Sequence, residues 1–261
     1  MPDLFYSPRL TLVRAQHHIS DFQNMVNGFT DSKPWTYFVD KESQPGQDLH
    51  KVRFISDLPA MLPCVLFDAT NNLRAVLDQA GYAAAVASKS ASLKATKFPS
   101  GPTLRDWQRD LAGRCKDLPP EIRAIFEAAR SYKGANDTLW AVNEVANANK
   151  HLALKPLNIS APSAFFTARS IGPGGMGEIV SPGGFGIGWN PDRREMTLWS
   201  APAATKTDLN LDLTFSIAVD GIDVITNQQA VSFLNAACNQ IERLLLETES
   251  ECRRLGFKVD P

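Results

Sequence analysis

The residues best suited to chemistry lie on one face of a helix that the sequence predicts at about residues 57–87. A stripe of Leu, Val and Ala forms the apolar face of this helix. On a wheel of 3.6 residues per turn, the opposite face carries Asp68, Asn71, Asn72, Asp78 and Gln79, with Arg74 at its edge. Exposed helix positions usually carry Lys, Glu or Gln, because the short side chains of Asp and Asn compete for backbone hydrogen bonds. The choice of Asp and Asn on this face therefore calls for an explanation, such as a binding partner for these side chains outside their own helix.

A second predicted helix, at about residues 137–154, offers groups that could be this partner. One of its faces carries Trp140, Asn143, Glu144, Asn147 and His151, with Lys150 beside them. If the two faces meet, the ammonium of Lys150 or the imidazole of His151 lies against a carboxylate of the first helix. The expected inter-helix polar network consists of Asp68, Asn72, Asp78, Asn147, Lys150 and His151.

Three interpretations of these two faces remain open. We favour a structural network, since buried amides and ion pairs can fix helix register at little net gain in stability. Alternatively, both faces point into solvent. The third interpretation is a ligand or catalytic site, such as that of a nuclease or another hydrolase. In that site His151 is the general acid or base and Asp78 orients it, while Arg74 or Lys150 stabilises a phosphate.

Two other motifs match known kinds of site only in part. Residues 172–177 read G-x-G-x-x-G, but a dinucleotide site needs this turn to open a helix, and β-like residues follow here. We interpret these glycines as hairpin turns and a loop. His17, His18 and Asp21 stand close together, yet no further ligand lies at metal spacing. The sequence therefore predicts no cofactor and no metal.

The order of the elements predicts an α+β fold. Further helices are expected at about 8–27, 103–115, 120–131 and 227–255. Two β-like runs at 35–41 and 49–56 predict a hairpin, and several more β-like runs fill residues 157–226. Helices, then strands, then a helix indicate segregated layers. We expect a helical layer or bundle, built from the N-terminal part and the C-terminal helix, with an antiparallel β-sheet from about 157–226.

Local signals give sharper expectations at three positions. Asn27-Gly28 is expected to end the first helix, Asp57 to cap the second, and Asp220-Gly221 to form a tight hairpin turn.

We expect residues 1–261 to form one interlocked domain. The hairpin should pair with the later strands, because an isolated hairpin is marginal in water. The closing helix should return to the helical layer. The alternative is a division into 1–156, mainly helical with the hairpin at 35–56, and 157–261, β-rich with the C-terminal helix.

The composition is that of an ordinary globular protein, with 44% hydrophobic and 21% charged residues. A net charge of −1 gives no overall attraction for nucleic acid. No apolar run reaches the length of a membrane span, and the first residues lack a signal-peptide pattern. The four cysteines are widely separated, which is typical of a reducing compartment. We therefore expect a cytoplasmic location.

The run from Asp68 to Gln79, with Asn149-Lys150-His151 further on, resembles a widespread group of uncharacterised bacterial proteins. Their pattern is roughly D-x-x-H-N-L-R-x-x-L-D-H, followed later by N-x-K-H or D-K-H. Phe98-Pro99 is similar to a short F-P segment of the same group. The resemblance covers about the first 155 residues and implies no activity. Asn71 and Gln79 stand where the pattern has histidines, so chemistry that needs those imidazoles is not expected.

A more distant similarity is to HEPN-type helical bundles, several of which are RNases. Their motif is Arg-x(4–6)-His with a polar residue after the Arg, and neither 14–17 nor 74–79 fits it. The hypothesis that we favour is a non-enzymatic protein whose β-rich half, with its glycine loop and aromatics, supplies an interaction or oligomer surface. Its partner is unknown, and a second copy of the chain is one option. The alternative is a HEPN-like nuclease or other hydrolase that uses His151 and Asp78.

Overall fold

A computed structural model describes the backbone of residues 3–41, 45–151, 157–172, 175–185, 188–203, 205–226 and 228–259. Its main helices are α1 (Tyr6–Asp31), α2 (Leu62–Ala87), α3 (Leu104–Arg114), α4 (Pro120–Ala129), α5 (Asp137–His151) and α6 (Ala230–Arg254). Its strands are β1 (Trp35–Asp40), β2 (Gln47–Phe54), β3 (Leu157–Gly172), β4 (Gly175–Phe185), β5 (Trp189–Asn190), β6 (Glu195–Pro202) and β7 (Lys206–Val219). The fold is α+β with antiparallel sheets, as the sequence predicts.

The chain forms two compact units, and each unit is assembled from separated stretches. The helical unit comprises Met1–Met25, Met61–Pro156 and Val219–Pro261, and the β-rich unit comprises Val26–Ala60 and Leu157–Ala218. β2 of the hairpin pairs with β6, and α6 packs against α2. Both expectations about distant partners are thereby confirmed. A division at residue 156 would separate the hairpin and α6 from the elements they pack against.

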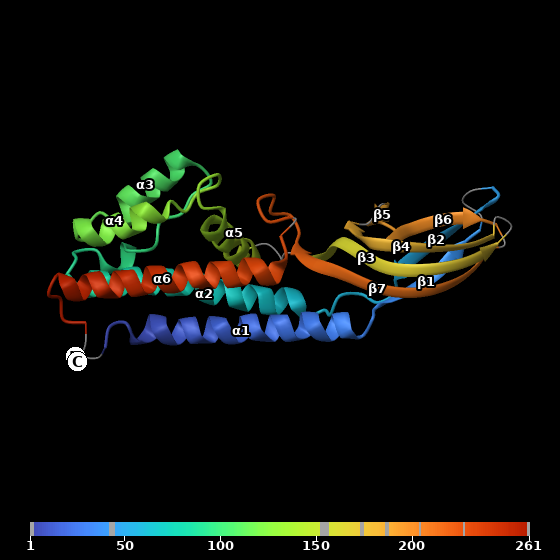
Figure 1. The fold of residues 1–261 in the computed structure, drawn as a ribbon. Coiled ribbons are helices and arrows are strands. Elements are labelled where there is room, and N and C mark those ends of the chain that lie inside the picture. The colour runs from blue at the N-terminus through green and yellow to red at the C-terminus, as the bar shows by residue number, and fades with distance from the viewer. Residues whose placement is uncertain are drawn as a thin grey trace. The chain divides into compact units, whose positions relative to one another are not determined.

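The helical unit is organised around α2, which packs against α5 and α6 (Figure 1). The predicted apolar stripe of α2 is buried, and Leu66, Leu73 and Val76 have no exposed surface. α6 contributes a matching stripe that includes Leu234 and Ile241, both also fully buried. Each helix thus places one apolar face in the core, which is the main source of stability for amphipathic helices.

α1 is joined to the rest of the helical unit by both apolar and polar contacts. Its buried side chains recur at helical spacing: Leu12, Ala15, Ile19 and Phe22. Nη1 of Arg9 donates to Oε1 of Glu249 on α6 at 2.6 Å. Glu249 is only 4% exposed, whereas the Arg9 side chain is 37% exposed, so this ion pair lies at the edge of the buried core.

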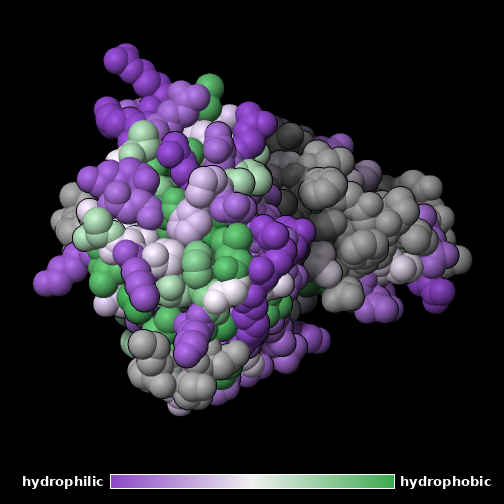
Figure 2. Space-filling view, turned by 90° about the vertical axis from the view of Figure 1, so that its left-hand side faces the viewer, coloured by the Kyte–Doolittle hydropathy of each residue, from purple (hydrophilic) through white to green (hydrophobic). Residues whose placement is uncertain are grey.

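Hydrophobic residues also reach the surface of the helical unit. Tyr6 is 62% exposed and Leu10 is 54% exposed, both on the side of α1 away from its buried stripe. Figure 2 views one face of the molecule, and hydrophobic residues show in its middle between projecting hydrophilic side chains. The helical unit therefore exposes part of its apolar surface.

The β-rich unit contains two sheets, with strand orders β1-β2-β6-β5 and β4-β3-β7. Aromatic rings join them: Phe54 of β2 meets Phe215 of β7 edge-on, with ring centroids 5.0 Å apart. In the second sheet, Gly172 lies opposite Gly175 in the β3–β4 register. This register confirms that the glycine-rich run belongs to a hairpin, although its residues 173 and 174 lie outside the described chain.

Three local expectations are wrong, each for a tertiary reason. α1 continues through Gly28 to Asp31, because Phe29 is held in a buried position against Phe215. α2 begins at Leu62 rather than near Asp57, whose carboxylate instead accepts a 2.6 Å hydrogen bond from Arg194.

The third correction concerns the end of β7. Gly221 has the positive φ of +72° that its turn signal predicts, but among the described residues that follow there is no return strand. Instead Ile222 and Ile225 are 4% and 2% exposed. Burial of these two side chains anchors the segment in the helical unit and overrides the hairpin signal.

Candidate functional site

Arg74 and Asp78, one helical turn apart on α2, bind the backbone of the segment that contains Phe98. Nη2 of Arg74 donates to Oδ1 of Asp78 at 2.9 Å and to the carbonyl oxygen of Phe98 at 2.7 Å. The backbone N–H of Phe98 donates to the same Oδ1 at 3.0 Å. The Arg74 guanidinium carbon also lies 5.8 Å from the centre of the Phe98 ring. Both backbone groups of Phe98 are thus paired with these two side chains.

The burial of Arg74, Asp78 and Phe98 limits whether these residues can bind a ligand. Arg74 is 9% exposed and Phe98 is fully buried. Nη1 of Arg74 is buried as well and has no hydrogen-bond partner among the described residues. The Asp78 side chain is 31% exposed. A guanidinium so enclosed is not open to a phosphate group, so these contacts are those of a structural clasp, which we call the Phe98 clasp.

Two more polar residues of this α2 face, Asn72 and Gln79, find partners nearby. Nδ2 of Asn72 donates to the backbone carbonyl of Asp68 at 2.6 Å. Oε1 of Gln79 accepts from the hydroxyls of Ser7 at 3.1 Å and Thr11 at 3.0 Å, both on α1. Sequence reasoning missed these two hydroxyls because a serine and a threonine four positions apart on a helix are too common to signal a partner.

The polar face of α5 is only partly described. Asn143 and Glu144 are half-buried, and Nδ2 of Asn143 donates to Oε1 of Glu144 at 3.4 Å. Asn147 is exposed. The side chains of Lys150 and His151 lie outside the described residues. The expected contact between these two residues and the carboxylates of α2 therefore stays a prediction.

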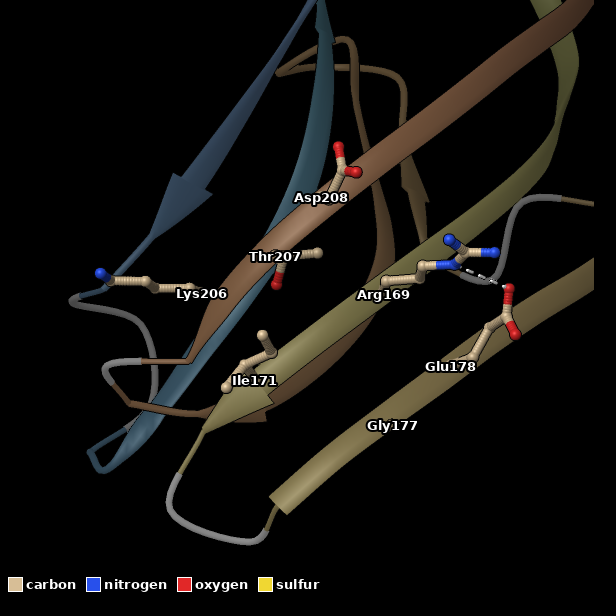
Figure 3. Close-up of a pocket in the computed structure, with 7 residues that line it drawn as sticks. All are labelled: Arg169, Ile171, Gly177, Glu178, Lys206, Thr207 and Asp208. Carbon is tan, nitrogen blue, oxygen red and sulfur yellow. Dashed lines mark hydrogen bonds and ion pairs between the residues drawn. The ribbon is translucent and has the colours of Figure 1, made fainter.

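A large cavity lies in the β-rich unit (Figure 3). It is a surface groove of about 670 Å³ formed by β3, β4 and β7, which we call the β-groove. Its lining residues are Arg169, Ile171, Gly177, Glu178, Lys206, Thr207 and Asp208. Arg169 and Glu178 are cross-strand partners and point toward one another, with Nε of Arg169 3.3 Å from Oε1 of Glu178 (Figure 3). Ile171, at the end of β3, is 62% exposed.

Lys206 and Asp208 of β7 differ from Arg169 and Glu178, because among the described residues they have no partner of opposite charge. No ion pair joins Lys206 or Asp208 to any other residue in the described ranges, and both are exposed. Thr207, between them, is half-buried, and its hydroxyl oxygen is buried with no hydrogen-bond partner in the part of the chain that the structure describes. The β-groove thus combines an exposed apolar side chain with one cation and one anion that have no ion partner among the described residues.

A cluster of aromatic rings lies in the other sheet and includes a buried histidine that the sequence did not single out. His50 is 2% exposed and stacks on Trp199 of β6, with ring centroids 4.1 Å apart. Nδ1 of His50 is hydrogen-bonded to the Tyr37 hydroxyl. Burial lowers the pKa of His50 from its ordinary value, against a smaller opposite effect from Asp48. The imidazole of His50 is enclosed between rings that are themselves only half-buried, so this cluster serves to pack the sheet.

No family model, curated protein or solved structure matches this chain. The resemblance to the bacterial group and to HEPN-type bundles therefore stays a prediction. Among the described helices, none is long and apolar enough to cross a membrane.

Proposed function

We propose that this protein is a non-enzymatic interaction protein whose β-rich unit binds an extended peptide segment of a partner in the β-groove. The observation that carries the proposal is the β-groove itself, about 670 Å³ in volume, with one exposed isoleucine and two charged side chains that have no ion partner within the described ranges. Small-molecule and peptide sites typically combine apolar surface with a few polar groups that fix orientation.

The spacing of the free charges supports a peptide as the occupant. Lys206 and Asp208 are two positions apart on β7, and alternate residues of a strand project on the same side about 6.6–6.8 Å apart. An extended peptide has the same repeat. A segment with an acidic and a basic residue two positions apart therefore matches both charges at once, while a neighbouring apolar side chain covers Ile171.

In this proposal the helical unit acts as a scaffold. The groups first considered for catalysis, Arg74 and Asp78, are bound to the backbone of Phe98, which supports a structural rather than a hydrolytic role. We further propose that the protein works in the cytoplasm. In its support, the thiols of Cys115 and Cys252 are free and buried, and burial raises the pKa of each to about 12, so neither is poised for disulfide exchange.

Binding of short labelled peptides, measured by fluorescence anisotropy, tests the proposal. The peptides are capped at both ends and differ only at two central positions, which are Glu-x-Lys, Lys-x-Glu or Ser-x-Ser. We expect one of the two charged orders to bind best and the Ser-x-Ser peptide to bind weakest. In a Lys206→Asp, Asp208→Lys double variant the preferred order should invert, because the two charges of the groove have changed places.

A second double variant, Asp192→Arg with Arg193→Asp, is the matched control. These residues form an exposed pair of opposite charges in the same unit but outside the β-groove. It should retain the wild-type preference. Equal binding of charged and uncharged peptides, or a preference that survives the exchange of Lys206 and Asp208, would show that the β-groove does not select such a segment.

A further inference from the structure

β7 is the last strand of the second sheet, whose strand order is β4-β3-β7. Among the described strands none pairs with the outer edge of β7, so its backbone groups on that side can accept a further strand. Exposed and half-buried side chains alternate from Lys206 to Asn210, as expected of an extended strand with one face toward solvent. The Lys206 side chain extends from β7 to the side away from β3 (Figure 3). This stretch of β7 is therefore suited to the addition of an extended segment.

The charges on this stretch restrict which segment can be added. Charged side chains on an edge strand normally discourage pairing with other strands. A copy of β7 itself is an exception, because Lys206 and Asp208 are two positions apart and opposite in sign. When two such strands lie antiparallel around a two-fold axis at Thr207, each Lys206 lies opposite Asp208 of the second copy. Opposite charges directly across an antiparallel pair are stabilising, so the segment is complementary to itself.

Two-fold symmetry also restricts the register. Residues directly opposite one another in an antiparallel pair lie on the same face of the sheet, so the axis must fall at a residue and not between two. With the axis at Lys206 two ammonium groups are opposed, and with the axis at Asp208 two carboxylates are opposed. The axis at Thr207 instead gives two attractive pairs. The half-buried Leu209 then lies opposite Thr205 of the second copy.

We propose that the extended segment recognised at the β-groove is β7 of a second copy of this chain, so that two β4-β3-β7 sheets join across a two-fold axis at Thr207. This inference rests on the function proposed above and names its partner. The interface is isologous, because residues 205–209 serve in both copies. A contact between two short edge segments is small, so we expect a reversible dimer rather than an obligate one.

Sedimentation velocity of the full chain over a series of concentrations, at low ionic strength, tests the dimer. The wild type should show a reversible monomer–dimer equilibrium. Lys206→Asp and Asp208→Lys should each weaken the dimer by about tenfold or more, because each turns two attractive pairs into two repulsive ones. The double variant Lys206→Asp, Asp208→Lys should dimerise like the wild type, since its exchanged charges are still complementary to a second copy.

An equimolar mixture of the two single variants is the sharper test. One variant has only acidic and the other only basic side chains at these two positions, so the mixture should form a heterodimer with the affinity of the wild-type dimer. Arg193→Asp and Asp192→Lys are the matched controls, because they change the net charge by the same amounts at exposed positions outside the β-groove. Each control should dimerise like the wild type, and mixing the two should add nothing.

A wild type that stays monomeric up to about 1 mM would overturn this inference. The same holds for single variants that dimerise as well as the wild type, and for a mixture of them that does not associate. The peptide assay described above separates such a failure from failure of the proposed function. If the monomeric protein still prefers one order of charges in the peptide, the β-groove binds a segment of another protein and only the dimer is wrong. If the peptides are not distinguished either, both proposals fail.

Discussion

Replacement of Asp78 by alanine should open the Phe98 clasp and destabilise the helical unit. The change removes two hydrogen bonds to a carboxylate, one from Arg74 and one from the Phe98 backbone. It also leaves the guanidinium of Arg74, in a residue only 9% exposed, without its counter-charge.

The size of the effect follows from these contacts. Hydrogen bonds to charged groups contribute about 1.5–3 kcal/mol each, and removal of one member of a buried ion pair costs about 3–5 kcal/mol. The Asp78 side chain is 31% exposed, so water replaces part of what is lost. We therefore expect a loss of about 2–4 kcal/mol, or roughly 5–12 °C in melting temperature for a unit of this size.

Native-state hydrogen exchange is the appropriate assay, because a chain with two compact units need not unfold in one step. The Phe98 amide should exchange faster in Asp78→Ala, together with amides of α2. Asp68→Ala is the matched control, since Asp68 lies on the same helix and its side chain forms no hydrogen bond or ion pair with the other described residues. The reasoning would be refuted by equal losses of stability, within about 0.5 kcal/mol, in Asp78→Ala and Asp68→Ala.

Three further predictions follow from the structure. Burial lowers the pKa of His50 below its ordinary 6.5, so the unfolded chain binds a proton at this residue more readily than the folded chain does. The stability of the fold should therefore be full above pH 6.5 and fall as the pH drops below it. Denaturant unfolding at pH 7.5 and about pH 5 should show this decline, and His50→Phe should reduce it. Glu249→Ala should cost about 1–2 kcal/mol in the same assay, because it removes the ion pair with Arg9 but leaves behind an arginine that is 37% exposed and can be hydrated. Gly101→Ala should destabilise the protein by about 1–3 kcal/mol, since the new Cβ would lie 2.6 Å from a backbone nitrogen of α3. The control Gly113→Ala places its Cβ where no atom lies within 4 Å, so this variant should be neutral or slightly more stable. Thermal melting of the two variants checks the difference.

Periodic patterns made most of the elements predictable. The apolar stripe of α2 and that of α6 each specify one buried face, and turn residues between two β-like runs specify the β1–β2 hairpin. The class α+β follows from the order of such segments. Boundaries were less predictable, because Gly28 and Asp57 carry local signals that packing elsewhere overrides.

The partners of polar residues could not be predicted in the same way. The α2 face does need partners, but Asp78 finds one at Phe98, twenty residues on, through backbone groups that no sequence pattern reveals. The β-groove combines residues from β3, β4 and β7 that lie far apart along the chain. Lys206, Thr207 and Asp208 lie within the stretch predicted to be β-rich, but they lack the apolar alternation that would mark them as the start of a strand.

A comparison of two isoleucine variants tests the proposed peptide site most directly. Ile171 in the β-groove is 62% exposed, and Ile55, in the same unit but outside the groove, is 63% exposed. Burial of a side chain so exposed is worth about 1–2 kcal/mol, or about five- to thirtyfold in affinity. Ile171→Ser should weaken binding of the preferred charged peptide by this factor, while Ile55→Ser should bind it like wild type. Equal affinities of the two variants would contradict the account that the β-groove is where the partner binds.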